Sequence, residues 1–235
     1  MAKYLLVSFK GCPWVQRVAI VLREKQIDFA FQHIEPDNRP DWFRAISPHN
    51  KVPVLRLDDR ISLFESGAIC EFLDETVTPR LHPEDPLARA IHRAWIDHMP
   101  VFIDIASGHA YVDTEAAFNA AAAKIPAAFE KLEAALIRQA AQHGDSGPFF
   151  DGARYSLVDA AYAPCLQRHL FLERIKPVGH IDRFPRLKAW AEAIVARPTT
   201  HSFPSAEYEA MYRDMVKRRN KWISQFIADP KDAAA

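Results

Sequence analysis

Short apolar runs and helix-spaced apolar residues alternate along the first third of the chain. Residues 4–7 are continuously apolar, which is typical of a strand buried on both faces of a sheet. Pro13 then stands where a first helical turn can begin, and apolar residues follow it at helical spacing up to Leu22. In residues 29–33 large apolar residues alternate with smaller or polar ones, so we expect a second, half-buried strand.

A hairpin and a further helix are predicted in the same region. After a short helical patch, the apolar runs 52–57 and 61–64 flank the turn-forming residues 58–60. The apolar residues that follow return to helical spacing. The order strand–helix–strand–helix–strand–strand–helix predicts an α/β domain over residues 1–78.

Beyond a proline-rich segment the chain has only helical patterns. Residues 76–86 contain three prolines in eleven positions, a composition that marks a linker. We therefore predict a linker over residues 79–86 and an all-helical C-terminal domain over residues 87–235. Pro126 should kink or divide a long alanine-rich helix over residues 115–141.

Two further patterns describe the helical part of the chain. Ser156 and Asp159 have the spacing of a capping box at the start of a helix. A last helix is predicted where aromatic and methionine side chains form one broad stripe between Tyr208 and Phe226. Because any docked helix shows such a stripe, we interpret it as core.

The composition excludes several classes of protein. Thirty basic and thirty acidic side chains give a formal charge of zero, whereas nucleic-acid-binding proteins usually have a basic excess. No uncharged stretch exceeds nine residues, and a membrane span needs about 20 mostly apolar ones. We therefore expect neither a nucleic-acid nor a membrane partner, and the N-terminus lacks the apolar core of a signal peptide.

The cysteines and histidines indicate a reducing compartment and no metal. Three cysteines that lie far apart do not make a disulfide framework, so the cytoplasm is the expected location. Ten histidines are present, but none has the H-E-x-x-H or tight Cys/His spacing that zinc sites use.

Cys12 is the sharpest chemical feature, because it lies between the first strand and the first helix. Free N–H groups and the helix dipole favour a thiolate there, and the thiolate is the nucleophilic form. Val15 takes the place of a resolving cysteine, so a mixed disulfide on Cys12 would need an external thiol. The alternative is a small packing residue, a role that we expect for Cys70 and Cys165 inside their apolar helical patterns.

Two other segments have candidate binding groups. Pro53 stands at the entry of a strand, and a cis bond there would expose the Val52 backbone N–H and C=O to an extended peptide. Ser66 is a natural N-cap whose neighbouring N–H groups could hold a carboxylate, and Glu65 could meet an ammonium group. Taken alone, each segment also fits an ordinary strand end or strand-to-helix junction.

Together these segments carry a resemblance to a known family. In order and spacing, Cys12 with Arg17, residues 51–55, and Glu65 with Ser66 resemble the thioredoxin-like half of the cytosolic glutathione transferases. The cysteine itself is similar to that of the cysteine-type members, which form a mixed disulfide with glutathione. Most similar among these is the omega class.

The second half of the chain resembles the helical half of the same family. Residues 156–159 look like its helix-capping motif, and residues 184–190 with 197–198 look like its penultimate-helix signature. The resemblance covers essentially the whole chain. It implies the glutathione transferase fold, an α/β thioredoxin-like N-terminal domain followed by an all-α C-terminal domain, and it implies a homodimer.

The resemblance also implies roles for individual residues, with Cys12 as the covalent nucleophile and glutathione as co-substrate. The residues implied to contact glutathione are Trp14, Arg39, Lys51, Val52, Pro53, Glu65 and Ser66. Val52 would pair with the cysteinyl backbone next to a cis Pro53, and Glu65 and Ser66 would hold the γ-glutamyl end.

The remaining implied roles concern the glycyl end and the second substrate. Arg39 and Lys51 would neutralise the glycyl carboxylate, while Trp14 would line the site beside the thiol. Arg39 replaces the lysine of the omega class, and Lys51 resembles tau-class members. Tyr111 and Trp222 are candidate walls of an acceptor pocket between the two domains.

The implied reaction is glutathione-dependent thiol transfer or reduction, acting on a small electrophilic or disulfide substrate. Two alternatives stay open: a glutathione-dependent isomerase or dehalogenase, and a non-catalytic binding or regulatory protein of the same fold. Non-catalytic members often lack the residue at position 12 or parts of the glutathione site. This sequence retains them, which favours an enzyme.

Overall fold

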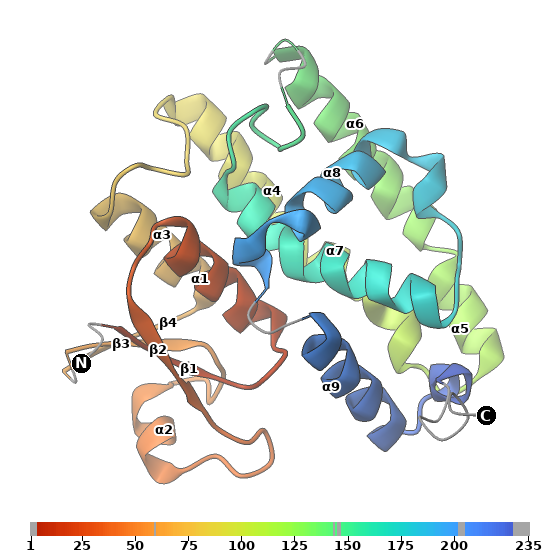
Figure 1. The fold of residues 1–235 in the computed structure, drawn as a ribbon, viewed down its shortest axis with the longest axis horizontal. Helices are drawn as coiled ribbons and strands as arrows, with labels where there is room; N and C mark the ends of the chain where they lie inside the picture. Colours follow the sequence, from red (N-terminus) through yellow and green to blue (C-terminus); the bar gives the residue numbers. More distant parts are fainter. Residues whose placement is uncertain (1–3, 59, 143, 145–146, 202–204, 228–235) are drawn as a thin grey trace. The chain divides into compact units, whose positions relative to one another are not determined.

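The chain folds into two compact units (Figure 1). A computed structural model describes residues 4–58, 60–142, 144, 147–201 and 205–227. The first unit comprises Met1–Ile96, Tyr155–Pro164 and Arg197–Ser202. The second comprises Asp97–Arg154, Cys165–Ala196 and Phe203–Ala235. The domain limits expected from sequence, with a linker over residues 79–86, stay a prediction.

A four-stranded sheet forms the centre of the first unit, with strand order β2-β1-β3-β4. Its strands are β1 (Tyr4–Ser8), β2 (Phe29–His33), β3 (Val54–Leu57) and β4 (Ile61–Phe64). β1 and β2 are parallel, and β3 is antiparallel to both β1 and β4. The predicted strands and hairpin are confirmed, although Asp59 lies outside the described residues. β3 begins two residues later than predicted, because Pro53 has no N–H for the ladder.

The strand register places the ends of β1, β2 and β4 and the start of β3 at one end of the sheet. Ser8 lies opposite His33, and Val7 lies opposite Val54. Val54 in turn lies opposite Phe64. The segments that follow β1 and β4 and the segment that precedes β3 therefore start or finish at the same end. These are the three segments that carry the candidate binding groups.

Three helices accompany the sheet: α1 (Pro13–Glu24), α2 (Asp41–Ile46) and α3 (Ser66–Thr76). α1 packs against α3 and buries a continuous stretch from Val15 to Leu22. At its far end Glu24 accepts two hydrogen bonds from Arg197, at 2.8 and 2.6 Å. Arg197 precedes the short helix η3 (Pro198–Thr200), which packs on α1.

The two longest helices begin at side-chain caps. α4 (Pro86–Gly108) starts after Asp85, whose carboxylate accepts the Ala88 N–H at 2.7 Å. α7 (Leu157–Ile175) starts at the predicted capping box. There the Asp159 carboxylate accepts the Ser156 N–H at 2.7 Å and the Ser156 hydroxyl at 2.6 Å.

The second unit contains shorter helical elements. They are η1 (His109–Tyr111), α5 (Glu115–Ala122), α6 (Ile125–Gln142), η2 (Ile181–Arg183), α8 (Pro185–Ala196), α9 (Ser205–Arg218) and η4 (Trp222–Phe226). α5 and α6 are the two halves of the predicted alanine-rich helix, divided just before Pro126 as expected. Among the described residues, none of these or the other helices combines the length and apolar character that a membrane crossing requires.

The prediction of one continuous last helix is wrong. α9 ends at Arg218, and Asn220 adopts a left-handed conformation with φ 48° that an asparagine tolerates better than most residues. Trp222 and Phe226 therefore belong to the separate element η4. The interpretation of the apolar stripe as core is confirmed for Tyr208, Tyr212 and Ile223, which are buried in one apolar cluster, whereas Phe226 is exposed.

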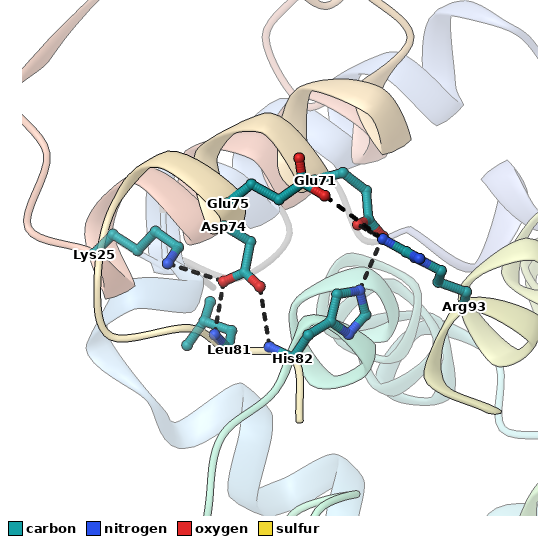
Figure 2. Close-up of polar contacts among 7 residues, drawn as sticks. All are labelled: Lys25, Glu71, Asp74, Glu75, Leu81, His82 and Arg93. Atoms are coloured by element: carbon teal, nitrogen blue, oxygen red, sulfur yellow. Dashed lines mark hydrogen bonds and ion pairs between the residues drawn. The ribbon is translucent and has the colours of Figure 1, made fainter. Parts of the chain in front are cut away.

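A buried ion pair ties the segment after α3 to both α1 and α3 (Figure 2). Lys25 Nζ lies 2.9 Å from Asp74 Oδ1, with both side chains almost fully buried. Lys25 also donates to the carbonyls of Val77 and Pro79, at 2.6 and 2.8 Å. The Asp74 carboxylate in turn accepts the backbone N–H groups of residues 81 and 82, at 2.6 and 3.1 Å.

A second carboxylate of α3 holds the start of α4 in the same network (Figure 2). Glu71 Oε1 lies 2.9 Å from His82 Nε2, and Glu71 Oε2 accepts a 2.5 Å bond from Arg93. Burial alone would raise the pKa of Glu71, but the hydrogen bonds from His82 and Arg93 lower that pKa to about 2. The lowered pKa makes this carboxylate a stabilising group above its ordinary pKa, and the benefit is lost as pH falls toward 2.

We expect Asp74→Asn to lower the free energy of unfolding by about 3–5 kcal/mol, because it leaves the Lys25 ammonium buried without its counter-charge. The measurement is urea-induced unfolding followed by circular dichroism. Asp41→Asn, which breaks the exposed pair with Arg44 on α2, is the matched control and should cost less than about 1 kcal/mol.

The double variant Lys25→Met/Asp74→Asn should be more stable than Asp74→Asn alone, since it also removes the stranded cation. An Asp74→Asn loss no larger than that of Asp41→Asn would contradict the assigned role of the buried pair.

Candidate functional site

Cys12 is the N-cap of α1, at the end of the sheet where β1 finishes. Gly11, with φ 75°, turns the chain, and the Cys12 N–H donates to the Phe9 carbonyl at 3.2 Å. The Cys12 carbonyl accepts the Gln16 N–H at 3.0 Å, the first hydrogen bond of the helix. The half-buried thiol thus lies at the helix N-terminus, as predicted, where the unpaired N–H groups favour negative charge.

The other two cysteines are packing residues, as expected. Cys165 is fully buried in α7, and Cys70 is buried in α3. Burial raises the pKa of the Cys70 thiol to about 12, although the nearby Arg17 opposes this and Glu71 adds to it. At neutral pH the Cys70 thiol is therefore protonated and enclosed, and Cys12 is the one cysteine of the three that is not buried.

The segment before β3 has the predicted cis bond between Val52 and Pro53. The Ser47 hydroxyl braces this segment by accepting the Lys51 N–H at 2.9 Å and donating to the Lys51 carbonyl at 2.8 Å. Over the described part of the chain, the Val52 backbone makes no hydrogen bond. Val52 itself is buried, while Lys51 next to it is exposed.

The segment after β4 differs from the prediction in one respect. Glu65, rather than Ser66, is the N-cap of α3, with φ 62° and an exposed side chain. Ser66 is the first helical residue and is buried, because its hydroxyl is turned to Arg17 of α1. The first hydrogen bond inside α3 joins the Ile69 N–H to the Glu65 carbonyl, so the N–H groups of residues 66–68 have no acceptor within the helix.

Arg39 is anchored beside the same segment. Its guanidinium donates to the Pro36 carbonyl at 3.0 Å and to the carbonyl of Asn50, the residue before Lys51. The Arg39 guanidinium carbon also lies 5.3 Å from the centre of the Phe9 ring. Two cationic side chains, from residues 39 and 51, therefore border the Val52 backbone.

The structure brings together the predicted residues of the first unit. Cys12 and Trp14 lie at the start of α1, Val52 and Pro53 lie before β3, and Ser66 starts α3. All three places are at the sheet end that the strand register defines.

The two predicted pocket residues of the second unit border one apolar cluster. Tyr111 bonds through its hydroxyl to the Tyr212 hydroxyl at 2.8 Å. Trp222 donates its backbone N–H to the Val112 carbonyl at 3.0 Å, and its ring lies 4.7 Å from that of Phe118. Both are half-buried, and their role as walls of an acceptor pocket stays a prediction.

Two residues of this end of the sheet were missed by sequence reasoning. Arg17 donates to the Ser66 hydroxyl through Nε and Nη2, at 2.9 and 2.6 Å. His33, the last residue of β2, lies with Nδ1 2.8 Å from the Ser8 hydroxyl. Partial burial and the charge of Lys10 lower the pKa of His33, so its imidazole is neutral at neutral pH. Arg17 was visible as part of the motif that starts at Cys12, but its partner depends on tertiary contacts.

No group of three or more His, Cys, Asp or Glu side chains suited to a metal ion occurs within the described ranges. The candidate site is therefore described by its thiol, its backbone groups and its charged side chains.

We expect iodoacetamide at pH 8 to alkylate the native protein once, at Cys12, because the Cys70 thiol is buried with a pKa of about 12 and Cys165 is enclosed. Peptide mass mapping after a short pulse is the measurement. A Cys12→Ser variant should take up no label when folded and two labels in urea. Labelling of Cys70 or Cys165 at a rate similar to Cys12 in the folded protein would contradict this assignment.

Comparison with protein families agrees with this geometry. The model described as "Glutathione S-transferase, N-terminal domain" matches residues 6–80, and "Glutathione S-transferase, C-terminal domain" matches residues 115–193. Glutathione S-transferase L1 of Arabidopsis thaliana is 32% identical over 194 residues, covering 80% of this chain and 76% of the relative. Glutathione S-transferase omega-1 of Rattus norvegicus is 27% identical over 228 residues, covering 96% of this chain and 87% of the relative.

Solved structures agree as well. An omega 3C glutathione transferase from Trametes versicolor superposes with a TM-score of 0.73 at 27% identity, covering 87% of this chain and 91% of that one. A tau-class glutathione S-transferase from Mangifera indica superposes with a TM-score of 0.79 at 24% identity, covering 91% of this chain and 98% of that one. At this identity the likeness is one of fold alone. With its thioredoxin-like sheet unit and its helical part, this chain belongs to the glutathione S-transferase family.

Proposed function

We propose that this protein is a glutathione-dependent thiol transferase or reductase in which Cys12 forms a mixed disulfide with glutathione. The observation that carries the proposal is the place of the Cys12 thiol, at the N-terminus of α1. The exposed start of α3 and the unpaired Val52 backbone lie at the same end of the sheet. A nucleophilic thiol beside a peptide-binding edge suits a cysteine-containing peptide as co-substrate.

Each part of glutathione has a matching group in this site. The Val52 N–H and C=O suit the cysteinyl backbone, and this pairing would direct the cysteinyl sulfur toward Cys12. Arg39 and Lys51 supply positive charge for the glycyl carboxylate. Trp14, half-buried in the first turn of α1, supplies an apolar wall beside the thiol.

In the proposed reaction the Cys12 thiolate attacks the glutathionyl sulfur of a substrate disulfide. The Cys12–glutathione bond forms as the substrate disulfide breaks, and the substrate thiolate leaves and takes a proton from water. The thiolate of a second glutathione then attacks the glutathionyl sulfur on Cys12. Oxidised glutathione and the free Cys12 thiolate are released, so one substrate thiol is formed for each molecule of oxidised glutathione.

An external thiol must complete the cycle, because Val15 occupies the place that a resolving cysteine would take. Cys70 cannot replace it, since this thiol is buried within α3 and protonated at neutral pH. The proposal therefore makes the rate of the second step depend on the concentration of free glutathione.

The proposal includes two properties outside the site. As in the family at large, the protein would act as a homodimer, which light scattering after size-exclusion chromatography measures. Its substrate would be a small electrophile or disulfide in a reducing cytoplasm, with Tyr111 and Trp222 as part of the acceptor pocket.

Incubation with oxidised glutathione should add one glutathionyl group to the protein, because the Cys12 thiolate displaces one half of the disulfide. Intact-mass spectrometry measures the adduct, and dithiothreitol should remove it. Cys12→Ser should acquire no adduct, whereas Cys70→Ala, the matched control, should acquire it as the wild type does. An unmodified wild type, or an adduct that persists in Cys12→Ser, would sink the mixed-disulfide mechanism.

Conjugation of glutathione to 1-chloro-2,4-dinitrobenzene should be weak in the wild type, because the Cys12 thiol competes with the glutathione thiolate for its place in the site. Absorbance measurements of the conjugate give the rate. Cys12→Ser, which supplies a hydroxyl in place of the thiol, should be no slower than the wild type. Efficient conjugation that is lost in Cys12→Ser would contradict the proposed role of the cysteine.

A further inference from the structure

Arg17 is a nearly buried cation that links α1 to the first turn of α3. Its side chain is 8% exposed, and it comes from the same helix that carries Cys12 at its N-cap. Nε donates to the Ser66 hydroxyl oxygen at 2.9 Å, and Nη2 donates to the same oxygen at 2.6 Å. The guanidinium carbon lies 5.3 Å from the centre of the Trp14 ring.

The two bonds from Arg17 decide how Ser66 can bind a ligand. A serine hydroxyl has two lone pairs and one proton, and Arg17 uses both lone pairs. The Ser66 hydroxyl can therefore act toward any further partner only as a donor.

The charge of Arg17 favours an anion at the same place. Within the part of the chain that the structure describes, Arg17 forms no ion pair. A buried cation without a counter-ion is costly, so an anion bound beside Ser66 would be attracted by both charge and hydrogen bonding. The unpaired N–H groups of residues 66–68 at the start of α3 add to this preference.

We propose that Arg17 is a positioning residue that makes Ser66 an obligate hydrogen-bond donor for a carboxylate. This inference rests on the proposed function, in which the bound carboxylate is the α-carboxylate of the γ-glutamyl group of glutathione. The exposed Glu65 next to Ser66 supplies the opposite charge for the α-ammonium group. The start of α3 with Arg17 thus matches the two charges of a free α-amino acid terminus.

A selectivity experiment can separate this positioning role from a purely structural one, in which Arg17 only joins α1 to α3. If the role is purely structural, loss of Arg17 would lower the stability of the protein and weaken the binding of every ligand by the same factor. If Arg17 instead orients the Ser66 hydroxyl as a donor and supplies positive charge beside it, loss of Arg17 would weaken only ligands that carry the α-carboxylate. The ratio of two affinities therefore separates the two roles.

The test compares glutathione with 4-aminobutanoyl-cysteinylglycine, which keeps the ammonium group and lacks the α-carboxylate. Dissociation constants are measured by isothermal titration calorimetry on the full chain under reducing conditions. The wild type should prefer glutathione by about tenfold to a hundredfold, the range of a charge-assisted hydrogen bond. In Arg17→Met the preference should fall below about threefold, and in Arg17→Lys, which keeps the charge without the fork, it should be intermediate.

Ser66→Ala supplies a second route to the same result, because it removes only the hydroxyl. It should also reduce the preference, and Arg17→Met/Ser66→Ala should lose no more than either single variant, since both residues act on one hydrogen bond. Arg44→Met, on the exposed face of α2, is the control with an unchanged preference. Arg39→Met should weaken both ligands equally, since Arg39 lies at the other end of the site.

A folded Arg17→Met or Ser66→Ala that keeps the full wild-type preference would overturn the inference while leaving the proposed function intact. If Arg17→Met does not fold, the Arg17→Lys ratio decides the question, because this variant also breaks the two bonds from the guanidinium to Ser66. A wild type that binds neither compound would overturn the proposed function and this inference together.

Discussion

The register between β1 and its two neighbours is the constraint on which the site depends. Because Ser8 lies opposite His33 and Val7 lies opposite Val54, three chain segments from different parts of the sequence meet at one end of the sheet. A slip of one residue would turn the buried side chains of β1 outward. The same slip would separate the Cys12 thiol from the Val52 backbone, so the core that fixes the register also assembles the site.

The buried pair of Lys25 and Asp74 fixes the position of the segment that follows α3. Lys25 lies at the C-terminal end of α1, and its ammonium holds two carbonyls of that segment while Asp74 holds two of its N–H groups. Backbone N–H and C=O groups that are buried just after the end of a helix need hydrogen-bond partners of this kind. α1 is therefore held at both ends, by the Ser66 contact near Cys12 and by this pair at the other end.

Local signals made much of the fold predictable, and tertiary contacts account for the rest. Pro13, Pro126 and the pair of Ser156 with Asp159 act on their own backbone neighbourhood, so the helix ends that they mark could be predicted from sequence. The break at Asn220 has a weak signal, because asparagine only tolerates the left-handed conformation. The bond between Arg17 and Ser66 spans 49 positions, and no local pattern can reveal it.

In the proposed function, a chain of zero formal charge would bind a ligand with several charges through the positions of a few charged side chains. Arg39 and Lys51 lie beside the Val52 backbone, Glu65 is exposed at the start of α3, and Arg17 is buried beneath it. In the proposed function the buried charge would have the largest effect on selectivity, because it is little screened by water. Since Arg17 and Cys12 belong to the same helix, a shift of α1 would move the Cys12 thiol and the Arg17 contact to Ser66 together. In the proposed function, the nucleophile and the group that binds the carboxylate would therefore move together with one helix.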